Sequence, residues 1–487
     1  MGEADHWEEP SGCIAGCLLT CDFDTKKQLF CNLVSEVSHC PSQILSVCTI
    51  LVRGGILQSL SCKTRLGDFM IRIYPFTALR PSFEDASEVS SDPYDVISTS
   101  EARERAAGKP KSFLHVVRSE IDFPVDTDCH VPEVYEKASD NLQGMIVDGV
   151  LQRESQPSIY LYRQVREGIA QVGVVGCVET EQYRTGEIRK HEKTRPDKED
   201  DRTRHLLATA SHAEPVFLCF RDEPNKGITI HSMMEADMEL SPLFDFVAPD
   251  GVQHTGWCVA EPARYVSAFE QLNRLYIADG HHRSAGAERA ATASKQADAN
   301  ASDEKEYGRF LAVVFPHDQL RILPYNRVVA DLNGLSADEF LIRLRAVGSL
   351  ERAKAGTPKS PGQALVFVAG GWWLLTFPEL SIDRNDPIAS LDVALLQDRV
   401  LSPILGIGDP RTDSRIAFVG GVRGCEELEE RAGDKGVAFS MHATSANELL
   451  AVADADEIMP PKSTWFEPKL RSGLFVHEFE RVDGAKA

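Results

Sequence analysis

Long apolar runs are missing from this sequence of 487 residues. No stretch reaches the roughly 20 apolar residues that a membrane-spanning helix needs, so we expect no membrane partner. The first ten residues, MGEADHWEEP, are acidic, whereas a secretory signal peptide begins with basic residues. We therefore expect a cytoplasmic protein, with an unusual organellar leader in residues 1–68 as the alternative that stays open.

Basic residues are also scarce. The chain carries 52 Lys and Arg against 74 Asp and Glu, which gives a formal net charge of −22. Such a surface repels a phosphate backbone, so we do not expect nucleic acid as a partner. Any anion must bind in a local basic pocket, and a small-molecule substrate is the partner that we expect.

Common metal-site spacings are absent as well. The 12 cysteines include no Cys-x-x-Cys pair, and the 14 histidines include no His-x-x-x-His pair. Both spacings are typical of zinc sites. We interpret the cysteines as buried or incidental thiols in a reducing compartment. A metal-dependent hydrolase that uses the histidines stays as an alternative.

The residues that are present predict a folded protein with more than one lobe. Hydrophobic residues make up 43% of the chain, and its length exceeds one compact core. Strand-like and helix-like stretches alternate, which is typical of a mixed α/β (α+β) fold. We expect an extension of unknown role in 1–68, a main domain in 69–333 and a carboxy-terminal α/β lobe in 334–487. The sequence gives no prediction of the oligomeric state.

Several elements can be predicted from local patterns. Residues 158–165 and 170–180 alternate like two strands of a hairpin, with Glu167 and Gly168 at the turn. Residues 131–151 have one apolar stripe at helical spacing. The stripe consists of Val134, Ala138, Leu142, Met145 and Ile146.

Helix caps are the next local signal. Ser100 is expected to cap a helix over 100–108, which Gly108 would close. Ser336, with Glu339 three residues later, forms a capping-box pattern that opens a helix near residue 334. We also expect Asp95, in the stretch PYDVIS, to cap the helix that follows it.

The most informative stretch is LYIADGHHRSAGAERA, residues 275–290. Its apolar start predicts a buried strand and its end predicts a helix, so Asp279 to Arg283 should form the turn between them. The first N–H groups of a helix lack intrahelical acceptors and carry positive charge, which favours phosphate. Gly280 would let an anion approach the backbone, and His281, His282 and Arg283 would add cationic donors.

Two other interpretations of this stretch stay open. Adjacent histidines on a helix point about 100° apart, so they are poorly placed to chelate one metal ion together. The second alternative is a capped helix with surface histidines, in which Asp279 serves only as the cap. Phosphate binding accounts for all five turn residues together.

A second cluster of charges occupies GEIRKHEKTRPDKEDDRTRH, residues 186–205. Pro196 breaks any helix through HEKTRP, so we expect a new helix from near Asp197. The loop before it carries His191, Glu192, Thr194 and Arg195. Such a loop can transfer a proton and hold a phosphate.

The alternative for this cluster is an ordinary solvated surface. On a helix, Glu199 would pair with Arg202 and Asp200 with Arg204, as neighbours three or four residues apart. The spacing leaves both interpretations open.

Six stretches together resemble the family called domain of unknown function 1015. The resemblance runs from about residue 70 to about residue 478. The stretches are PYDVIS, SFLHVVRSEID, KHEKTRPDKEDDR, YIADGHHRSA, FPHDQLRILPYNRVV and MPPKSTWFEPKLRSG.

Within that pattern, DGHHRSA is similar to the glycine and basic-residue box of the ParB and sulfiredoxin superfamily. In that superfamily the box binds nucleotide phosphates at a helix start, so the resemblance implies a ParB/sulfiredoxin-like nucleotide-binding core. Sulfiredoxin carries a reactive cysteine where this chain has His281, so sulfinic-acid repair is not expected. ParB proteins add a DNA-binding helical domain, for which the sequence has no pattern.

The superfamily includes free-serine kinases. The resemblance therefore implies a nucleotide-dependent phosphotransferase that uses ADP, ATP or CTP with Mg²⁺. The acceptor would be a small hydroxyl-bearing metabolite, with L-serine as the candidate. A nucleotide-binding switch without kinase activity is the alternative from a different class.

On this hypothesis Glu192 is the catalytic base, His191 and Arg195 support it, and Asp279 orients the turn or binds the metal. Two later turns are expected to contribute to nucleotide binding through Arg411 and Lys462. The turn itself contributes Gly280, His281, His282 and Arg283. For the second of the later turns, we favour the interpretation that Trp465 and Phe466 anchor a carboxy-terminal tail on the core.

Overall fold

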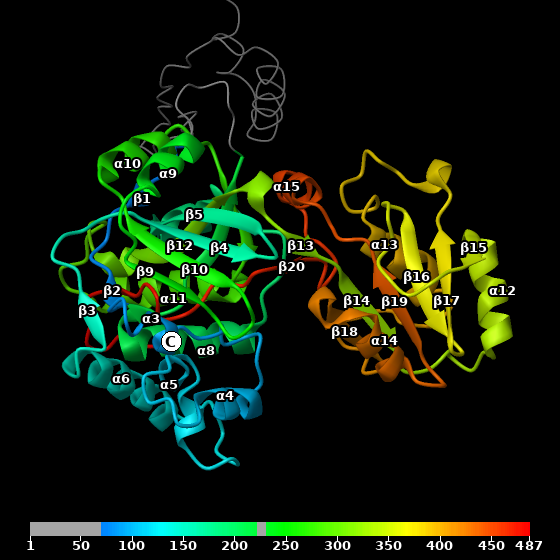
Figure 1. The fold of residues 1–487 in the computed structure, drawn as a ribbon, viewed down its shortest axis with the longest axis horizontal. Helices are drawn as coiled ribbons and strands as arrows, with labels where there is room; N and C mark the ends of the chain where they lie inside the picture. Colours follow the sequence, from blue (N-terminus) through cyan, green and yellow to red (C-terminus); the bar gives the residue numbers. More distant parts are fainter. Residues whose placement is uncertain (1–69, 222–229) are drawn as a thin grey trace, which may run out of the picture. The chain divides into compact units, whose positions relative to one another are not determined.

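The computed structural model describes residues 70–221 and 230–487. The chain divides into two units, Met1–Gly67 and Asp68–Ala487, and the described residues belong to the second. The extension predicted in 1–68 lies outside the described residues. Helices and strands alternate along the described residues, and the strands form several sheets, which confirms the mixed α/β fold class (Figure 1).

A nine-stranded sheet positions the residues of interest. Its order is β6-β11-β8-β12-β5-β4-β10-β9, and β1 pairs with β5. In that order the strands are Ile188–Arg189, Leu275–Asp279, Val216–Phe220, Arg309–Pro316, Ile169–Glu179, Tyr160–Arg166, Gln253–Cys258 and Phe244–Val247, with β1 at Ile73–Tyr74.

The predicted hairpin is confirmed. Strands β4 and β5 pair antiparallel over the length of β4, and Glu167 and Gly168 turn between them with positive φ angles of 54° and 77°. Successive residues of the sheet contribute to two different core clusters, for example Ile277 to one and Tyr276 to the other. Because side chains of a strand alternate between faces, this sheet is buried on both sides.

Three helices matter for the site. Helix α6 (Pro132–Val147) buries four of the five predicted stripe residues, and Ile146 is half-buried. Helix α8 (Pro196–Thr209) starts at the proline, as predicted, and packs against α11 (His281–Ala297). The close approach of α8 and α11 occurs at Gly286, where an added Cβ would lie 2.9 Å from the Cβ of Arg202.

A six-stranded sheet of order β15-β17-β16-β19-β14-β18 follows along the chain. Helix α12 (Ala337–Val347) belongs to this part, and its predicted capping box of Ser336 and Glu339 is confirmed. From β15 to β18 in the order of the sheet, its strands are Ser349–Arg352, Gly371–Thr376, Gln363–Val368, Val437–Met441, Tyr325–Val329 and Ile416–Gly420.

The end of the chain forms two separate two-stranded sheets with earlier segments. Strand β20 (Trp465–Phe466) pairs with β13 (Ile322–Leu323), and β21 (His477–Glu478) pairs with β7 (Ser211–His212). The six-stranded sheet also takes in β14, which precedes the boundary expected at residue 334. Strands from before residue 334 thus pair with strands from after it. The division into lobes at residue 334 stays a prediction.

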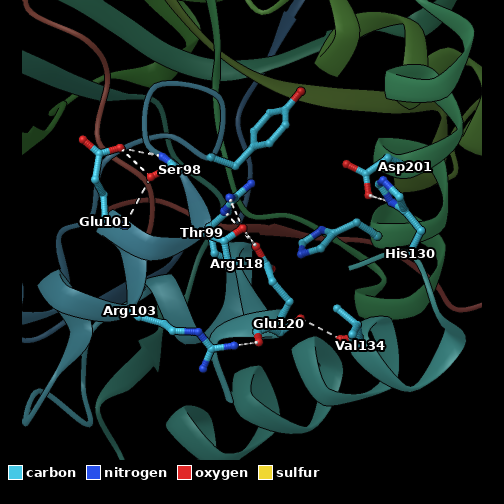
Figure 2. A network of polar contacts seen from close by, with 12 residues as sticks. Ser98, Thr99, Glu101, Arg103, Arg118, Glu120, His130, Val134 and Asp201 are labelled. Atoms are coloured by element: carbon cyan, nitrogen blue, oxygen red, sulfur yellow. Dashed lines mark hydrogen bonds and ion pairs between the residues drawn. The ribbon is translucent and has the colours of Figure 1, made fainter. Parts of the chain in front are cut away.

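One predicted cap is wrong by two residues. Helix α4 (Thr99–Ala106) is capped by Ser98, whose side chain and backbone N–H exchange hydrogen bonds with Glu101 (Figure 2). Neither Ser100 nor Asp95 is the cap. In the described parts of the chain, no helix is both long enough and apolar enough to cross a membrane.

Candidate functional site

The strand, turn and helix predicted around DGHHR are confirmed. Strand β11 ends at Asp279, Gly280 has a left-handed backbone with φ 95° and ψ 31°, and α11 begins at His281. We expected this helix to begin at Ser284, but it begins three residues earlier, at His281. A side chain at residue 280 would be strained by this φ, and its Cβ would lie 2.9 Å from Nε of Arg283.

Both histidines hold the preceding loop through their Nε2 atoms. Nε2 of His281 accepts the backbone N–H of His191 at 3.4 Å, and Nε2 of His282 accepts that of Arg195 at 3.1 Å. An accepting Nε2 in a neutral ring leaves the proton on Nδ1. In His281 this Nδ1 lies 4.0 Å from a carboxylate oxygen of Glu192. The loop from 191 to 195 is therefore attached to the start of α11.

The expectation that these histidines are cationic is wrong. Burial lowers the pKa of His281 to about 3, and burial also lowers the pKa of His282. The ring of His191 stands edge-on to that of His281, with centroids 4.4 Å apart, and burial lowers its pKa to about 3. All three rings are neutral at pH 7, because a buried ring loses hydration when it is charged. Positive charge at the turn has other sources.

Arg283 is one of these sources. Its side chain is 7% exposed, donates to the carbonyl of Pro215 and lies 3.7 Å from Asp279. Burial lowers its pKa, but Asp95 and Asp279 outweigh burial and raise it. Its buried Nε–H has no hydrogen-bond partner in the described residues. Arg283 therefore supports the turn and leaves one orphaned donor beside the helix start.

Asp279 ties the turn to the end of the chain. One carboxylate oxygen accepts the N–H of Gly280 at 3.0 Å, and the other accepts Nζ of Lys469 at 2.9 Å. Burial raises the pKa of this carboxyl, but Lys469 and Arg283 outweigh burial and hold it well below its usual range. This arrangement fits the predicted orienting role.

The metal role of Asp279 fits less well. Both of its oxygens already face donors, so a Mg²⁺ ion would have to displace Lys469 or the N–H of Gly280. The described residues include no group of three or more His, Cys, Asp or Glu placed to hold a metal ion. Metal binding at Asp279 stays a prediction.

A carboxy-terminal strap, residues 459–472, crosses both the loop and the turn. The backbone N–H of Met459 donates to the carbonyl of His191 at 2.9 Å. Lys462, one of the predicted residues, has a positive φ of 55°. The side chain of Lys462 is exposed. Desolvation by the surrounding protein lowers its pKa, but Tyr325, Glu192, Asp95 and Asp279 outweigh this effect and raise it. The structure therefore brings Lys462 within electrostatic reach of the turn and the loop.

Arg411 is not brought to this place. It lies in the turn before β18, where its backbone N–H donates to Asp409. Strand β18 pairs with β14 so that Ile416 opposes Val329 and Gly420 opposes Tyr325. Lys462 lies over the Tyr325 ring, and four residues of strand span roughly 13 Å. Arg411 is therefore beyond the opposite end of β14.

A buried polar chain lies behind the turn. Glu214 accepts the backbone N–H of Tyr94 at 2.9 Å and a guanidinium N–H of Arg202 at 3.2 Å. Arg202 also pairs with Asp201 at 2.7 Å and lies over the Tyr94 ring at 3.7 Å. The expected surface pair of Glu199 with Arg202 is wrong, because Arg202 points into the core.

Asp200 does not pair with Arg204 as expected. Its carboxylate pairs instead with Arg289 of α11, which also lies 3.5 Å from Glu199. These two acidic residues therefore link α8 to α11.

Figure 2 shows how this chain continues between α4, α6 and α8. Asp201 lies 3.4 Å from His130. Its carboxylate also accepts the hydroxyl of Tyr135 at 2.9 Å. Beside it, Arg118 pairs with Glu120 at 3.0 Å and donates to Thr99 at 2.9 Å. No spacing in the sequence relates the partners of these contacts, so the contacts could not be predicted.

Fold and site together define a mixed α/β protein in which a glycine turn opens a helix beside buried basic groups. The model of the family described as "Protein of unknown function (DUF1015)" matches residues 73–394, about two thirds of the chain. The chain belongs to this family. The match ends well before residue 478, so the strap lies outside it.

Solved structures with a similar arrangement have low scores. One is a free serine kinase in complex with AMP, 12% identical, with a TM-score of 0.32 over 63% of this chain and 92% of that chain. SbnI with a C-terminal truncation from Staphylococcus aureus is 13% identical, with a TM-score of 0.34 over 62% and 87%. A conserved hypothetical protein from Pyrococcus furiosus is 12% identical, with a TM-score of 0.31 over 62% and 95%.

The search of curated proteins found no match. The similarity of DGHHR to the ParB and sulfiredoxin box stays a prediction.

Proposed function

We propose that this protein is a nucleotide-dependent phosphotransferase that acts on a small hydroxyl-bearing metabolite, with L-serine as the first candidate. The observation that carries the proposal is the start of α11. There a left-handed Gly280 precedes free helical N–H groups, and Lys469 and Arg283 lie beside them. Together these groups favour the phosphates of a nucleotide.

The proposed roles follow the charge of each residue. The helix start, Arg283 and Lys469 hold phosphate oxygens, since all three offer N–H donors to such acceptors. His281 and His282 are neutral and hold the loop from 191 to 195 in place. Mg²⁺, when bound with the nucleotide, neutralises part of the phosphate charge. We assign it no ligand.

Glu192 is the proposed base. Its side chain is 37% exposed and lies beside His281, so it can reach both solvent and an acceptor. The acceptor oxygen would attack the terminal phosphorus, its proton would pass to Glu192, and the phosphoanhydride bond would break. Such a transfer depends on positioning and electrostatics, which a fixed loop provides.

The test is nucleotide consumption by the full chain with Mg²⁺ and ADP, ATP or CTP, with and without L-serine. Mass detection of phosphoserine identifies the product. We expect Glu192→Gln to lose about 100-fold or more of the turnover, the usual contribution of a general base. Its nucleotide affinity, measured by calorimetry, should stay close to that of the unmodified protein.

Glu181→Gln is the matched control, because Glu181 is an exposed glutamate that pairs with Arg184 in its own helix, α7 (Thr180–Thr185). An unchanged turnover in Glu192→Gln would remove Glu192 as the base. Tight nucleotide binding without any product that depends on an acceptor would favour a nucleotide-binding switch instead of a kinase.

A further inference from the structure

Two cations next to the proposed site have no carboxylate partner in the part of the chain that the structure describes. No carboxylate oxygen of the described residues lies within 4.0 Å of the charged nitrogens of Lys462 or Arg327. Arg327 is 3% exposed, and its guanidinium donates to the carbonyls of Tyr325 and Pro461. Both bonds go to neutral oxygens, and the guanidinium lies 5.4 Å from the centre of the Phe418 ring. Among the described residues, no anion therefore compensates the charge of Arg327.

An uncompensated buried charge is costly in a folded protein. Burial lowers the pKa of Arg327 to about 10, so the side chain still carries its charge at pH 7. Lys462 adds a second cost, because its left-handed φ of 55° is uncommon for residues other than glycine. Unfavourable features of this kind are often found at binding sites, where a bound ligand compensates for them.

The two cations lie close together and close to the turn. Arg327 donates to the carbonyl of Pro461, the residue before Lys462. Nζ of Lys462 lies 5.5 Å from the centre of the Tyr325 ring, which stands edge-on to Trp465 at 5.4 Å. Trp465 in turn lies under Nζ of Lys469, the lysine that pairs with Asp279.

The surroundings of the two lysines differ. Asp279 compensates Lys469, which lies at the turn. Lys462 has only longer-range carboxylates, and Glu192 is among those that raise its pKa. The backbone N–H of Met459, three residues before Lys462, donates to the carbonyl of His191, the neighbour of Glu192. The strap therefore brings Lys462 to the loop that carries the proposed base, and Arg327 contacts the same strap at Pro461.

We propose that Lys462, supported by Arg327, binds the carboxylate of the acceptor, and that the acceptor is a hydroxy acid or hydroxy amino acid. This inference rests on the proposed function. The hydroxyl would lie at Glu192, and the carboxylate would take the place of the missing counter-ion at Lys462. Simple alcohols and the amides of the same acids would lack that interaction.

The experiment is calorimetric binding to the full chain, which requires no turnover. The probes are L-serine and glycerate, each against its carboxamide, and ADP in a separate titration. We expect the acids to bind at least about tenfold more tightly than the amides, the usual effect of one charge-assisted hydrogen bond. Lys462→Met should abolish this preference and leave the Kd of ADP within about twofold.

Two variants control for structure. Arg327→Met should also weaken acid binding, and Arg327→Lys should restore part of it if charge is what matters. Lys359→Met, at an exposed lysine of the six-stranded part, should change neither titration.

Two results would overturn the inference. One is equal binding of acid and amide by the unmodified protein. The other is a loss of ADP affinity in Lys462→Met as large as the loss of acid affinity, which would assign Lys462 to the phosphates. The proposed function fails separately, if no acceptor increases nucleotide consumption.

Discussion

At the scale of single residues, Asp201 shows how a buried carboxylate depends on its partners. Burial raises its pKa, but Arg202 and the hydroxyl of Tyr135 outweigh burial and lower it to about 2. A carboxyl whose pKa is lower in the folded state stabilises the protein above its ordinary pKa of about 3.9. That stabilisation, about 2 kcal/mol, is lost as the pH falls toward 2.

We therefore expect Asp201→Asn to lower the free energy of unfolding by about 2 kcal/mol at pH 7 and by about half of that near pH 3. Urea unfolding at both pH values, followed by circular dichroism, measures the difference. Asp140→Asn, at an exposed position of α6, is the control and should change little. An equal loss at both pH values would mean that the charge of Asp201 is not what stabilises the fold.

The same scale explains which site residues could be predicted. Gly280 and Asp279 were placed correctly, because a turn between a strand and a helix is a local pattern. The neutral state of His281 could not be predicted, since the loop that covers it lies 90 residues away along the chain. The pairing of Lys469 with Asp279 joins residues 190 positions apart and has no local signal.

At the scale of elements, the contact between α8 and α11 depends on the absence of a side chain at Gly286. An added Cβ would lie 2.9 Å from Cβ of Arg202 and 3.3 Å from the backbone nitrogen of Thr203. Neither atom is the end of a flexible side chain, so the helices would have to separate. Gly286→Ala should therefore cost about 1 to 2 kcal/mol of stability, although alanine favours a helix.

Gly144→Ala gives the opposite expectation in α6. No atom lies within 4 Å of an added Cβ there, so the better helix propensity should raise stability by about 0.5 to 1 kcal/mol. Thermal unfolding of both variants measures the two signs. A stabilised Gly286→Ala would show that α8 and α11 can move apart without cost.

Element boundaries could be predicted where the cap pattern was recognised. Ser336 and Glu339 gave the start of α12 correctly. The start of α4 was missed, although Ser98 and Glu101 have the same spacing, because Ser100 was chosen as the cap. Ser98 and Ser100 both have the residue type of a helix cap. Ser98 is the cap because it forms reciprocal hydrogen bonds with Glu101.

At the scale of the whole molecule, the order of strands could not be predicted. Strand β20 pairs with β13, and Leu323 and Trp465 in this pair are 142 residues apart along the chain. Strand β21 pairs with β7, and His212 and His477 in that pair are 265 residues apart. No periodicity in the sequence indicates either pairing. The strap supplies Lys462 and Lys469 to the proposed site, yet it lies beyond the residues that match the family model. The proposed site is therefore complete only in the full chain.

The end of the chain should also be essential for folding. Residues after Asp456 contribute four large apolar side chains to one core cluster, which they share with strands of the nine-stranded sheet. These are Phe466, Leu470, Leu474 and Phe475. At about 1.5 to 3 kcal/mol each, they contribute on the order of 6 to 12 kcal/mol, which is comparable to the whole stability of a typical domain.

We expect a chain that stops after Asp456 to fail to fold, because its first sheet would expose the surface that these side chains cover. A chain that lacks only residues 482–487 is the control, since it keeps Arg481, which donates to the carbonyl of Ala208 in α8. Soluble yield and cooperative thermal unfolding distinguish the two. If the shorter chain unfolded cooperatively at the same temperature as the full chain, the strap would serve the site alone, and its burial would add nothing to the fold.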